Sequence, residues 1–286
     1  MCGIVGLHLR DPELHPRLGV LLETMLGHMC ERGPDSAGVA VYGDRRRCPE
    51  GWAAVSLLDA PPDLSVPGAL ITAAGDTTVV AAPLTVDELV AAVRGTGALV
   101  VGSGTDLTVY KGTGHPRDLA RTYDLAGAQG WQGLAHTRMA TESAVTASGC
   151  HPFSVGPDQC LVHNGSFANH ATIRRELEAD GVVFDSENDS EVGARFVASR
   201  LAAGDDLDKA LRLLCERFDG FYTLLVTSAD GFAVVRDAIA CKPAIIAETD
   251  AWVAMASEFR ALAELPGIDR AKIWEPEPER VHAWVR

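Results

Sequence analysis

Four short apolar segments follow one another in the last third of this 286-residue chain. They cover residues 220–228, 232–237, 244–248 and 252–256, and a turn signal at Ala229, Asp230 and Gly231 separates the first two. Connections this short join antiparallel strands, because a parallel pair needs a crossover of a dozen or more residues. The sequence therefore predicts antiparallel sheets and argues against a doubly wound parallel sheet.

The preceding residues supply the other parts of an α+β fold. Helical patterns come in a block at residues 169–180, 189–203 and 207–217, and an amphipathic helix is expected at 14–31, where Gly33 and Pro34 end it. Strands are expected at 2–9, 37–42, 131–137, 159–163 and 281–285, with a short helix near 258–265. This pattern predicts helices packed on antiparallel sheets.

Residues 44–130 interrupt that order. Prolines punctuate the first part of this stretch, and strands at 77–82, 98–102 and 107–111 then alternate with helices at 85–94 and 116–126. We expect the stretch to form a small α/β insertion with its own local core, inside one domain that covers residues 1–286.

Composition narrows the range of functions. The formal net charge is −14, so nucleic acid is not an expected partner, and the only short basic run, Arg45 to Arg47, is expected to lie in a solvated loop. Neither a membrane helix nor a secretory signal is expected. None of the seven cysteines sits in a C-x-x-C pair, which argues against disulfide, zinc and iron–sulfur frameworks. We expect a reduced, cytoplasmic protein that holds no metal and no cofactor in this chain.

Six short motifs carry the residues with chemical potential. They are MCGIVG at 1–6, RGPDSAG at 32–38, HTRMAT at 136–141, HPF at 151–153, HNG at 163–165 and NDSEV at 188–192. Each also has a purely structural interpretation. Cys2 could be a small residue at a strand edge, Asn164 and Gly165 a β-turn, and Asp189 a helix N-cap. The histidines of these motifs are expected to be structural or surface residues, because their spacing fits no metal site.

Taken together and in this order, the motifs resemble those of the class II glutamine amidotransferases, which are N-terminal-nucleophile hydrolases. The resemblance continues into ASEFRAL at 256–262 and covers the chain apart from the 44–130 stretch. It implies a four-layer αββα sandwich of two antiparallel sheets. It also implies an enzyme that releases ammonia from the side-chain amide of glutamine.

The resemblance assigns the catalytic roles to three residues. Removal of Met1 would leave Cys2 with a free α-amine beside its thiol, so that one residue supplies both the nucleophile and the base. Attack on the amide carbon would lead to a γ-glutamyl thioester, which water converts to glutamate. Asn164 and Gly165 would stabilise the oxyanion of the tetrahedral intermediate.

The same resemblance assigns substrate-binding and supporting residues. Arg138 matches the arginine that binds the α-carboxylate of glutamine, for which a guanidinium fork is well suited. Asp189 matches the acid that binds the α-ammonium, and Thr141 is expected to add a hydroxyl. Arg32 and Asp35 are expected to support the site structurally.

Some features differ from the family pattern and indicate a subfamily. Met139 stands where an aromatic residue is common, and the 44–130 stretch is longer than in the hexosamine-forming members. We expect a stand-alone subunit without a synthase domain, because the HTRMATES stretch resembles the separate amidotransferase subunit of glutamate-synthase-like enzymes, such as N-methylglutamate synthase. That resemblance implies a hetero-oligomer in which ammonia passes to a synthase subunit that carries flavin or an iron–sulfur cluster.

Two other functions fit the same residues. A free-standing hydrolase of other γ-glutamyl amides would bind the γ-glutamyl group in the same way. A non-catalytic regulatory subunit would keep the pocket as a relic, and retention of Met1 would favour it. Labelling of Cys2, substrate preference and the mass of the processed chain separate these alternatives.

Overall fold

The structure, a computed structural model, describes residues 2–139 and 145–286 in two antiparallel sheets of the body and one smaller sheet. The first body sheet has the order β14 (Lys272–Trp274), β12 (Ile245–Glu248), β13 (Trp252–Ala256), β1 (Gly3–Leu9), β8 (Gln132–Arg138), β2 (Ser36–Tyr42) and β7 (Leu107–Thr113). The second has the order β15 (His282–Val285), β11 (Gly231–Arg236), β10 (Gly220–Thr227) and β9 (Cys160–Phe167). The predicted antiparallel pairing is therefore confirmed.

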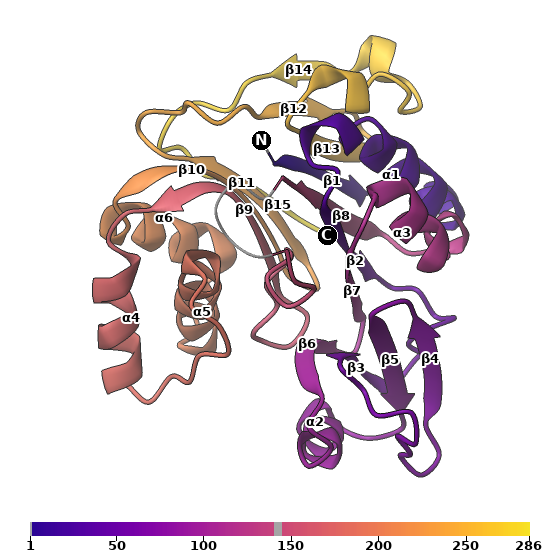
Figure 1. Cartoon of the computed structure of the whole chain (residues 1–286). Helices are drawn as coiled ribbons and strands as arrows, with labels where there is room; N and C mark the ends of the chain where they lie inside the picture. The colour runs from indigo at the N-terminus through magenta and orange to yellow at the C-terminus, as the bar shows by residue number, and fades with distance from the viewer. Residues whose placement is uncertain (1, 140–144) are drawn as a thin grey trace.

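Helices cover the outer faces of both body sheets (Figure 1). Helix α1 (Leu18–Gly27) packs on the first sheet beside α3 (Pro116–Thr122), and its Leu18, Leu22 and Met25 meet Val5 and Leu7 of β1. Helices α4 (His170–Ala179), α5 (Asp189–Ala202) and α6 (Leu207–Arg217) pack on the second sheet. A third apolar core joins the facing sheets. These layers confirm the predicted αββα sandwich.

Strand β1 lies inside the first sheet, between β13 and β8. All seven of its residues are buried, because α1 covers one face and the second sheet covers the other. Val5 and Leu7 belong to the core beneath α1, whereas Ile4 belongs to the core between the sheets. This double burial explains why GIVGLHL is almost uninterruptedly apolar instead of alternating. It also places Cys2, the residue before β1, at the edge of the space between the sheets.

A smaller unit projects from the body (Figure 1). Its sheet has the order β4 (Leu70–Ala74), β5 (Thr77–Ala82), β3 (Ala53–Leu58) and β6 (Leu99–Gly104), and helix α2 (Val86–Arg94) packs on it through Leu89 and Val93. Thr85 and Glu88 form a capping box at the start of α2. The unit is shorter than the expected 44–130 stretch, because β7 pairs with β2 and α3 packs beside α1, so both belong to the body.

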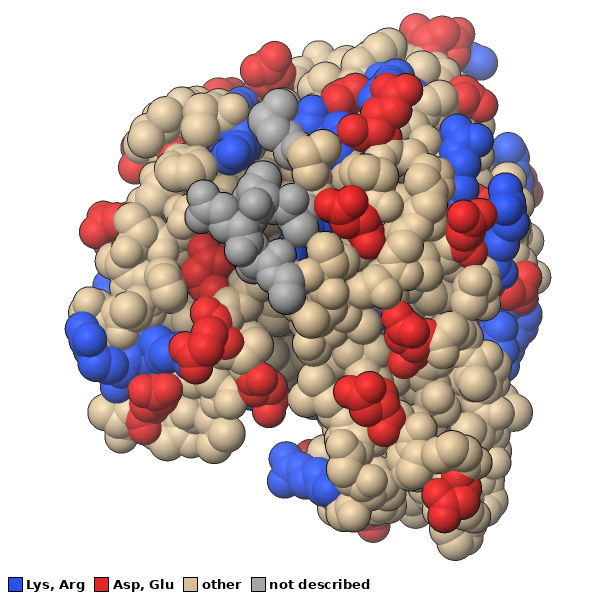
Figure 2. Space-filling model, in the orientation of Figure 1, with Lys and Arg blue, Asp and Glu red and all other residues tan. Residues whose placement is uncertain are grey.

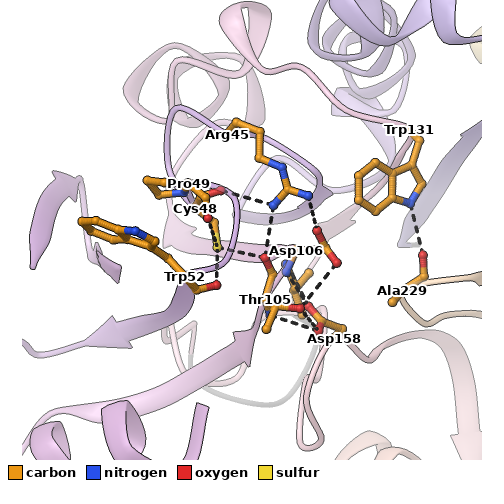
Figure 3. Close-up of polar contacts among 10 residues, drawn as sticks. Arg45, Cys48, Pro49, Trp52, Thr105, Asp106, Trp131, Asp158 and Ala229 are labelled. Atoms are coloured by element: carbon orange, nitrogen blue, oxygen red, sulfur yellow. Dashed lines mark hydrogen bonds and ion pairs between the residues drawn. The ribbon is translucent and has the colours of Figure 1, made fainter. Parts of the chain in front are cut away.

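Charged side chains join the small unit to the body (Figure 3). The carboxylate of Asp158 accepts hydrogen bonds from the backbone N–H groups of Thr105, Asp106 and Leu107 at 2.9–3.0 Å, where β6 leads into β7. Arg45 forms an ion pair with Asp106 at 2.6 Å. The basic run at 45–47 lies in a turn and exposes Arg45 and Arg46, as predicted, and Arg45 also connects this turn to the start of β7.

No helix in residues 2–139 or 145–286 is long and apolar enough to cross a membrane.

Candidate active site

The backbone of Cys2 connects two of the predicted motifs. Its thiol is free and half-buried, and its carbonyl oxygen accepts hydrogen bonds from Nε of Arg32 at 3.0 Å and Nδ2 of Asn164 at 3.3 Å. Arg32 follows α1 in the chain, whereas Asn164 lies on β9 of the facing sheet. The fold thus brings the beginning of the chain, the RGPDSAG motif and the HNG motif to one point.

A second set of contacts fixes the start of β1, and sequence reasoning did not assign its residues. The N–H of Ile4 donates to Oγ of Ser257 at 2.9 Å, and the N–H of Ser257 donates back to the carbonyl of Ile4 at 2.9 Å. Glu258 forms an ion pair with the largely buried Arg32 at 2.8 Å. Both residues come from the ASEFRAL stretch, so its resemblance to the family was the available signal. These contacts hold Cys2 in place through its neighbours.

Asn164 and Gly165 lie inside a strand, which excludes the β-turn interpretation. Asn164 stands opposite Thr223 and Gly165 opposite Tyr222 in the pairing of β9 with β10. Gly165 has φ +143°, and a Cβ atom there would lie 1.9 Å from the carbonyl oxygen of Phe221. Only glycine fits this backbone conformation and this close approach. The Asn-Gly pair is therefore a strand feature at the edge of the proposed site.

Asp189 begins α5 but does not cap it. Asn188 is the N-cap, because its side chain accepts from the N–H of Ser190 at 2.9 Å. The carboxylate of Asp189 instead turns to β9, where Oδ2 accepts from the N–H of Phe167 at 2.9 Å. The NDSEV motif therefore holds a partly exposed carboxylate beside the strand that carries Asn164 and Gly165.

Buried histidines stand behind Asp189, and Ser190 connects them to it. Oγ of Ser190 lies 2.8 Å from Nδ1 of His163, 3.0 Å from Nε2 of His151 and 3.3 Å from Oδ1 of Asp189. Burial lowers the pKa of His163 to about 4 and that of His136 to about 3, and it lowers the pKa of His151 well below its usual value. All three rings are therefore neutral at pH 7.

Because the rings are neutral, each carries one N–H, and the contacts of Ser190 indicate which ring nitrogen holds it. A hydroxyl donates one hydrogen bond and accepts two, which matches its three neighbours if both histidines donate and Ser190 donates to Asp189. The remaining ring atoms, Nε2 of His163 and Nδ1 of His151, have no hydrogen-bond partner among the described residues. In this arrangement these two nitrogens carry lone pairs and no hydrogen. A buried acceptor without a partner costs less free energy than a buried N–H without one. Two histidines and a serine thus orient the Asp189 carboxylate.

Arg138 ends β8 beside the RGPDSAG motif. Its Nη1 donates to the carbonyl of Gly149 at 3.3 Å, and its backbone carbonyl accepts from the N–H of Asp35 at 3.2 Å. A Cβ atom on Gly33 would lie 2.5 Å from the Arg138 backbone, so glycine permits this close packing. The predicted Arg138 and Asp35 are therefore brought together. The predicted Thr141 lies outside the described residues.

Among the residues that the structure describes, no group of three or more His, Cys, Asp or Glu side chains could hold a metal ion.

Comparisons with known proteins match the segments that carry the predicted motifs. Residues 136–264 match the model of a glutamine amidotransferase domain, which includes the HTR, HNG and NDSEV motifs. The chain is 47% identical to the glutamine amidotransferase-like protein GlxB of Rhizobium meliloti, over 99% of this chain and 98% of that protein. The chain belongs to the class II glutamine amidotransferase family. A putative glutamine amidotransferase of Methanothermobacter thermautotrophicus is 28% identical over 99% of both chains.

A solved structure supports the fold of this class II amidotransferase. The glutamine phosphoribosylpyrophosphate amidotransferase of B. subtilis superimposes with a TM-score of 0.64 at 18% identity. The match covers 99% of this chain and 49% of the other, so this amidotransferase spans about half of that protein. Family membership confirms the function class, glutamine amidotransferase, that the motifs implied.

Proposed function

We propose that Cys2 is the nucleophile of a glutaminase reaction and that Asn164, Gly165, Arg138 and Asp189 complete its site. The observation that supports this proposal is the meeting of the Cys2 backbone carbonyl with Asn164 and Arg32, because it brings the residue that carries the thiol to the HNG strand. The partly exposed carboxylate of Asp189, which accepts a hydrogen bond from Phe167 of the same strand, supplies a group that attracts an ammonium.

The chemistry uses groups of this chain alone. After removal of Met1, the α-amine of Cys2 takes the thiol proton, and the sulfur attacks the amide carbon of glutamine. Oε1 of the glutamine amide becomes an oxyanion, toward which the Asn164 amide and the Gly165 N–H donate; one such donor contributes about 3–4 kcal/mol. The protonated α-amine of Cys2 then gives its proton to the leaving amide nitrogen. Ammonia departs, and a γ-glutamyl thioester on Cys2 remains. Water then releases glutamate and restores the thiol.

Selectivity for a free amino acid follows from two opposite charges. The Arg138 guanidinium suits the α-carboxylate, since it can donate two parallel hydrogen bonds. Asp189 suits the α-ammonium, and the Ser190 hydroxyl holds one of its oxygens. Thr141 adds a hydroxyl in this proposal, while Arg32 and Asp35 support the site through the backbone contacts described above.

We also propose the destination of the ammonia. The resemblance to the separate amidotransferase subunit of glutamate-synthase-like enzymes, of the N-methylglutamate synthase type, favours transfer to a synthase subunit in a cytoplasmic hetero-oligomer. Flavin or an iron–sulfur cluster would belong to that partner. Purification of the complex from its native source, with identification of the co-purified chains, tests this part.

Covalent labelling tests the nucleophile. A diazoketone analogue of glutamine should add one adduct per chain at Cys2 and abolish glutaminase activity. Cys2→Ser should lower kcat by about 10³-fold or more and prevent the adduct. Cys241→Ser is the matched control, because Cys241 is an exposed free cysteine outside the site, and it should change neither. An adduct elsewhere, or an active Cys2→Ser enzyme, would refute the assignment.

Two measurements separate the alternative functions. If another γ-glutamyl amide gives a higher kcat/KM than glutamine, the enzyme is a hydrolase of that compound. If the mass of the chain from cells shows that Met1 is retained, the amine is blocked and a regulatory role without catalysis is favoured.

A further inference from the structure

A small cavity lies where the small unit meets the body, outside the site described above. Its walls come from β6, β7 and the segments at 148–155 and 185–191, and the molecular surface is hollowed between the small unit and the side of α5 (Figure 2). The lining residues that matter here are Lys111, Phe153, Ser154 and Glu191. We call this space the lysine cavity.

Lys111 is a buried cation that no carboxylate of the described residues contacts directly. Its side chain is 2% exposed and forms no hydrogen bond and no ion pair within the described parts of the chain. Its ammonium lies 4.6 Å from the centre of the Phe153 ring, a cation–π contact that compensates only part of the lost hydration. Burial lowers the pKa of Lys111 to about 8, so most of the side chain is still charged at pH 7.

The nearest acidic side chain of the cavity is already occupied. Glu191 accepts from the N–H groups of Asp185 and Ser186 at 2.9 and 2.7 Å, and from the Ser186 hydroxyl at 2.7 Å. Arg195 adds a charged partner at 3.0 Å. All the acceptor positions of this carboxylate are therefore in use, so it attracts Lys111 through its charge but forms no hydrogen bond with it.

A second polar group in the cavity is also unpartnered. Oγ of Ser154 is buried and has no hydrogen-bond partner in the described part of the chain. The space beside it measures about 40 Å³, enough for a group of a few atoms, since a single water needs about 10–15 Å³. A buried ammonium and a buried hydroxyl therefore face a space that can hold a small acceptor.

The lysine cavity opens into a larger hollow. The two spaces share Leu99, Val100, Ser154, Val155 and Asp185, and the outer hollow has a volume of about 340 Å³. Val86, Val90, Ala98 and Pro157 form an apolar strip in its wall, which two acidic and two basic side chains also line, namely Asp87, Asp185, Arg94 and Arg195. The combination is a small inner space with one buried ammonium and a longer, more polar approach that carries an apolar strip.

We propose that this pair of spaces binds a small organic monocarboxylate, with the carboxylate on Lys111 and Ser154 and the apolar body in the outer hollow. One ammonium neutralises one negative charge, so a monoanion leaves no unpaired charge in the interior, whereas a dianion such as phosphate would. The carboxylate would accept a charge-assisted hydrogen bond from Nζ and a neutral one from Oγ. The proposal does not depend on the assignment of Cys2.

Calorimetric titration of the full chain tests the proposal with three probes. Sodium butyrate should bind with saturable heat, and butyramide, which has the same shape without the charge, should bind at least tenfold more weakly. Inorganic phosphate should not compete. Tighter binding of butyramide or of phosphate than of butyrate would overturn the assignment.

Variants locate the binding. Lys111→Met should weaken butyrate binding by about tenfold or more, and Ser154→Ala by a smaller factor. Lys209→Met removes an exposed lysine away from the cavity and should leave binding unchanged. Arg138→Met should also leave it unchanged, because a loss there would place butyrate in the glutamine site and contradict the proposal. Equal affinity of Lys111→Met and the wild type would contradict it as well, provided thermal unfolding shows that the variant is folded.

Discussion

Two sets of buried polar side chains each include one residue on the same row of the first sheet, His136 for the histidine set and Lys111 for the lysine cavity, and the two sets are stabilised in opposite ways. The ring of His136 lies 4.2 Å from that of His151, which together with His163 of β9 contacts Ser190. His136 stands opposite Gly38 on β2, and Gly38 stands opposite Lys111 on β7. On the β8 side, neutral histidines surround Ser190, whose hydrogen-bonding capacity is fully used. On the β7 side, Lys111 keeps a charge that has a cation–π contact with Phe153 but no hydrogen bond or ion pair among the described residues.

The histidine set holds a carboxylate in a fixed position, whereas Lys111 is a buried group whose hydrogen-bonding capacity is unused within the described parts of the chain. A satisfied network rigidifies its members, so Asp189 is held in place before any substrate arrives. An unsatisfied buried charge lowers stability, and each such group in a native protein requires an explanation, such as a ligand. Changes in the histidine set should therefore lower stability or activity, whereas removal of the Lys111 charge should raise stability.

Acid should destabilise the protein through the histidines, and this is the largest effect expected. The folded-state pKa values of His136 and His163 are about 3 and 4, below the usual 6.5, so the unfolded chain binds more protons as the pH falls below 6.5. The stabilisation is complete above pH 6.5 and is lost toward pH 4. Each of these two residues should lower the free energy of unfolding by roughly 2 kcal/mol between pH 7.5 and pH 5.

Urea unfolding at several pH values measures this loss. His163→Gln should reduce the slope of unfolding free energy against pH between 6.5 and 5. His115→Asn is the control, because His115 is an exposed helix cap and asparagine can replace its role. Equal slopes for the wild type and His163→Gln would show that the rings are not held neutral.

Gly165→Ala should damage both the fold and the activity. The new Cβ would overlap the Phe221 carbonyl in a backbone conformation at φ +143°. We expect a loss of about 3 kcal/mol of unfolding free energy and at least about 100-fold in glutaminase kcat, since the strand that offers the oxyanion donors must move. Gly181→Ala is the matched control: its φ is also positive, but nothing lies within 4 Å of the added atom. Similar losses in both variants would show that backbone strain alone is responsible.

The sequence predicted elements well where their signals are local. The strand expected at 77–82 is Thr77–Ala82, and the helix expected at 207–217 is Leu207–Arg217, which begins behind the capping side chain of Asp206. The helix expected at 14–31 is shorter, because Pro16 confines residues 12–17 to a 3-10 turn and α1 ends at Gly27. Strands β3, β4 and β14 were missed, since proline-rich flanks or short length hid partners that only the folded sheet supplies.

For the site, sequence motifs identified individual residues but not the contacts between them. Cys2, Arg32 and Asn164 each belonged to a recognisable motif, but their meeting at one carbonyl depends on two sheets facing each other. Ser190 was not predicted, because a serine after an acidic residue carries no signal of two histidines behind it. Lys111 was not predicted either, since a lysine in a strand at the edge of a sheet normally points to solvent.

Ser190→Ala should affect substrate binding more than catalysis. Without the hydroxyl, Asp189 loses one hydrogen bond and both histidines lose their acceptor, so KM for glutamine should rise about tenfold while kcat changes less than threefold. Ser199→Ala, on the same helix, removes a hydroxyl that bonds only the carbonyl of Phe196 and serves as control. The amide of glutaric acid, which lacks the α-ammonium, should show no difference between Ser190→Ala and the wild type. A KM increase for both substrates would assign Ser190 a merely structural role.

Lys111→Met should stabilise the protein, which is the smallest effect and the one with the opposite sign. Methionine keeps most of the volume and removes a buried charge, so unfolding free energy at pH 7 should rise by about 1 kcal/mol in the absence of a carboxylate. The folded-state pKa of Lys111 is about 8 and the usual value is 10.5, so between these values the unfolded chain binds more protons, and wild-type stability should rise with pH. The advantage of the variant should shrink over the same window. Urea unfolding at pH 7 and pH 10 measures the gain in stability and its change with pH. Lys209→Met is the reference: it removes an exposed lysine with its ion pair to Asp205 and should lower the unfolding free energy by about 0.5 kcal/mol or less. A loss of stability in Lys111→Met at pH 7 would mean that the ammonium has a stabilising partner. Both sets of buried polar groups would then be satisfied inside the protein.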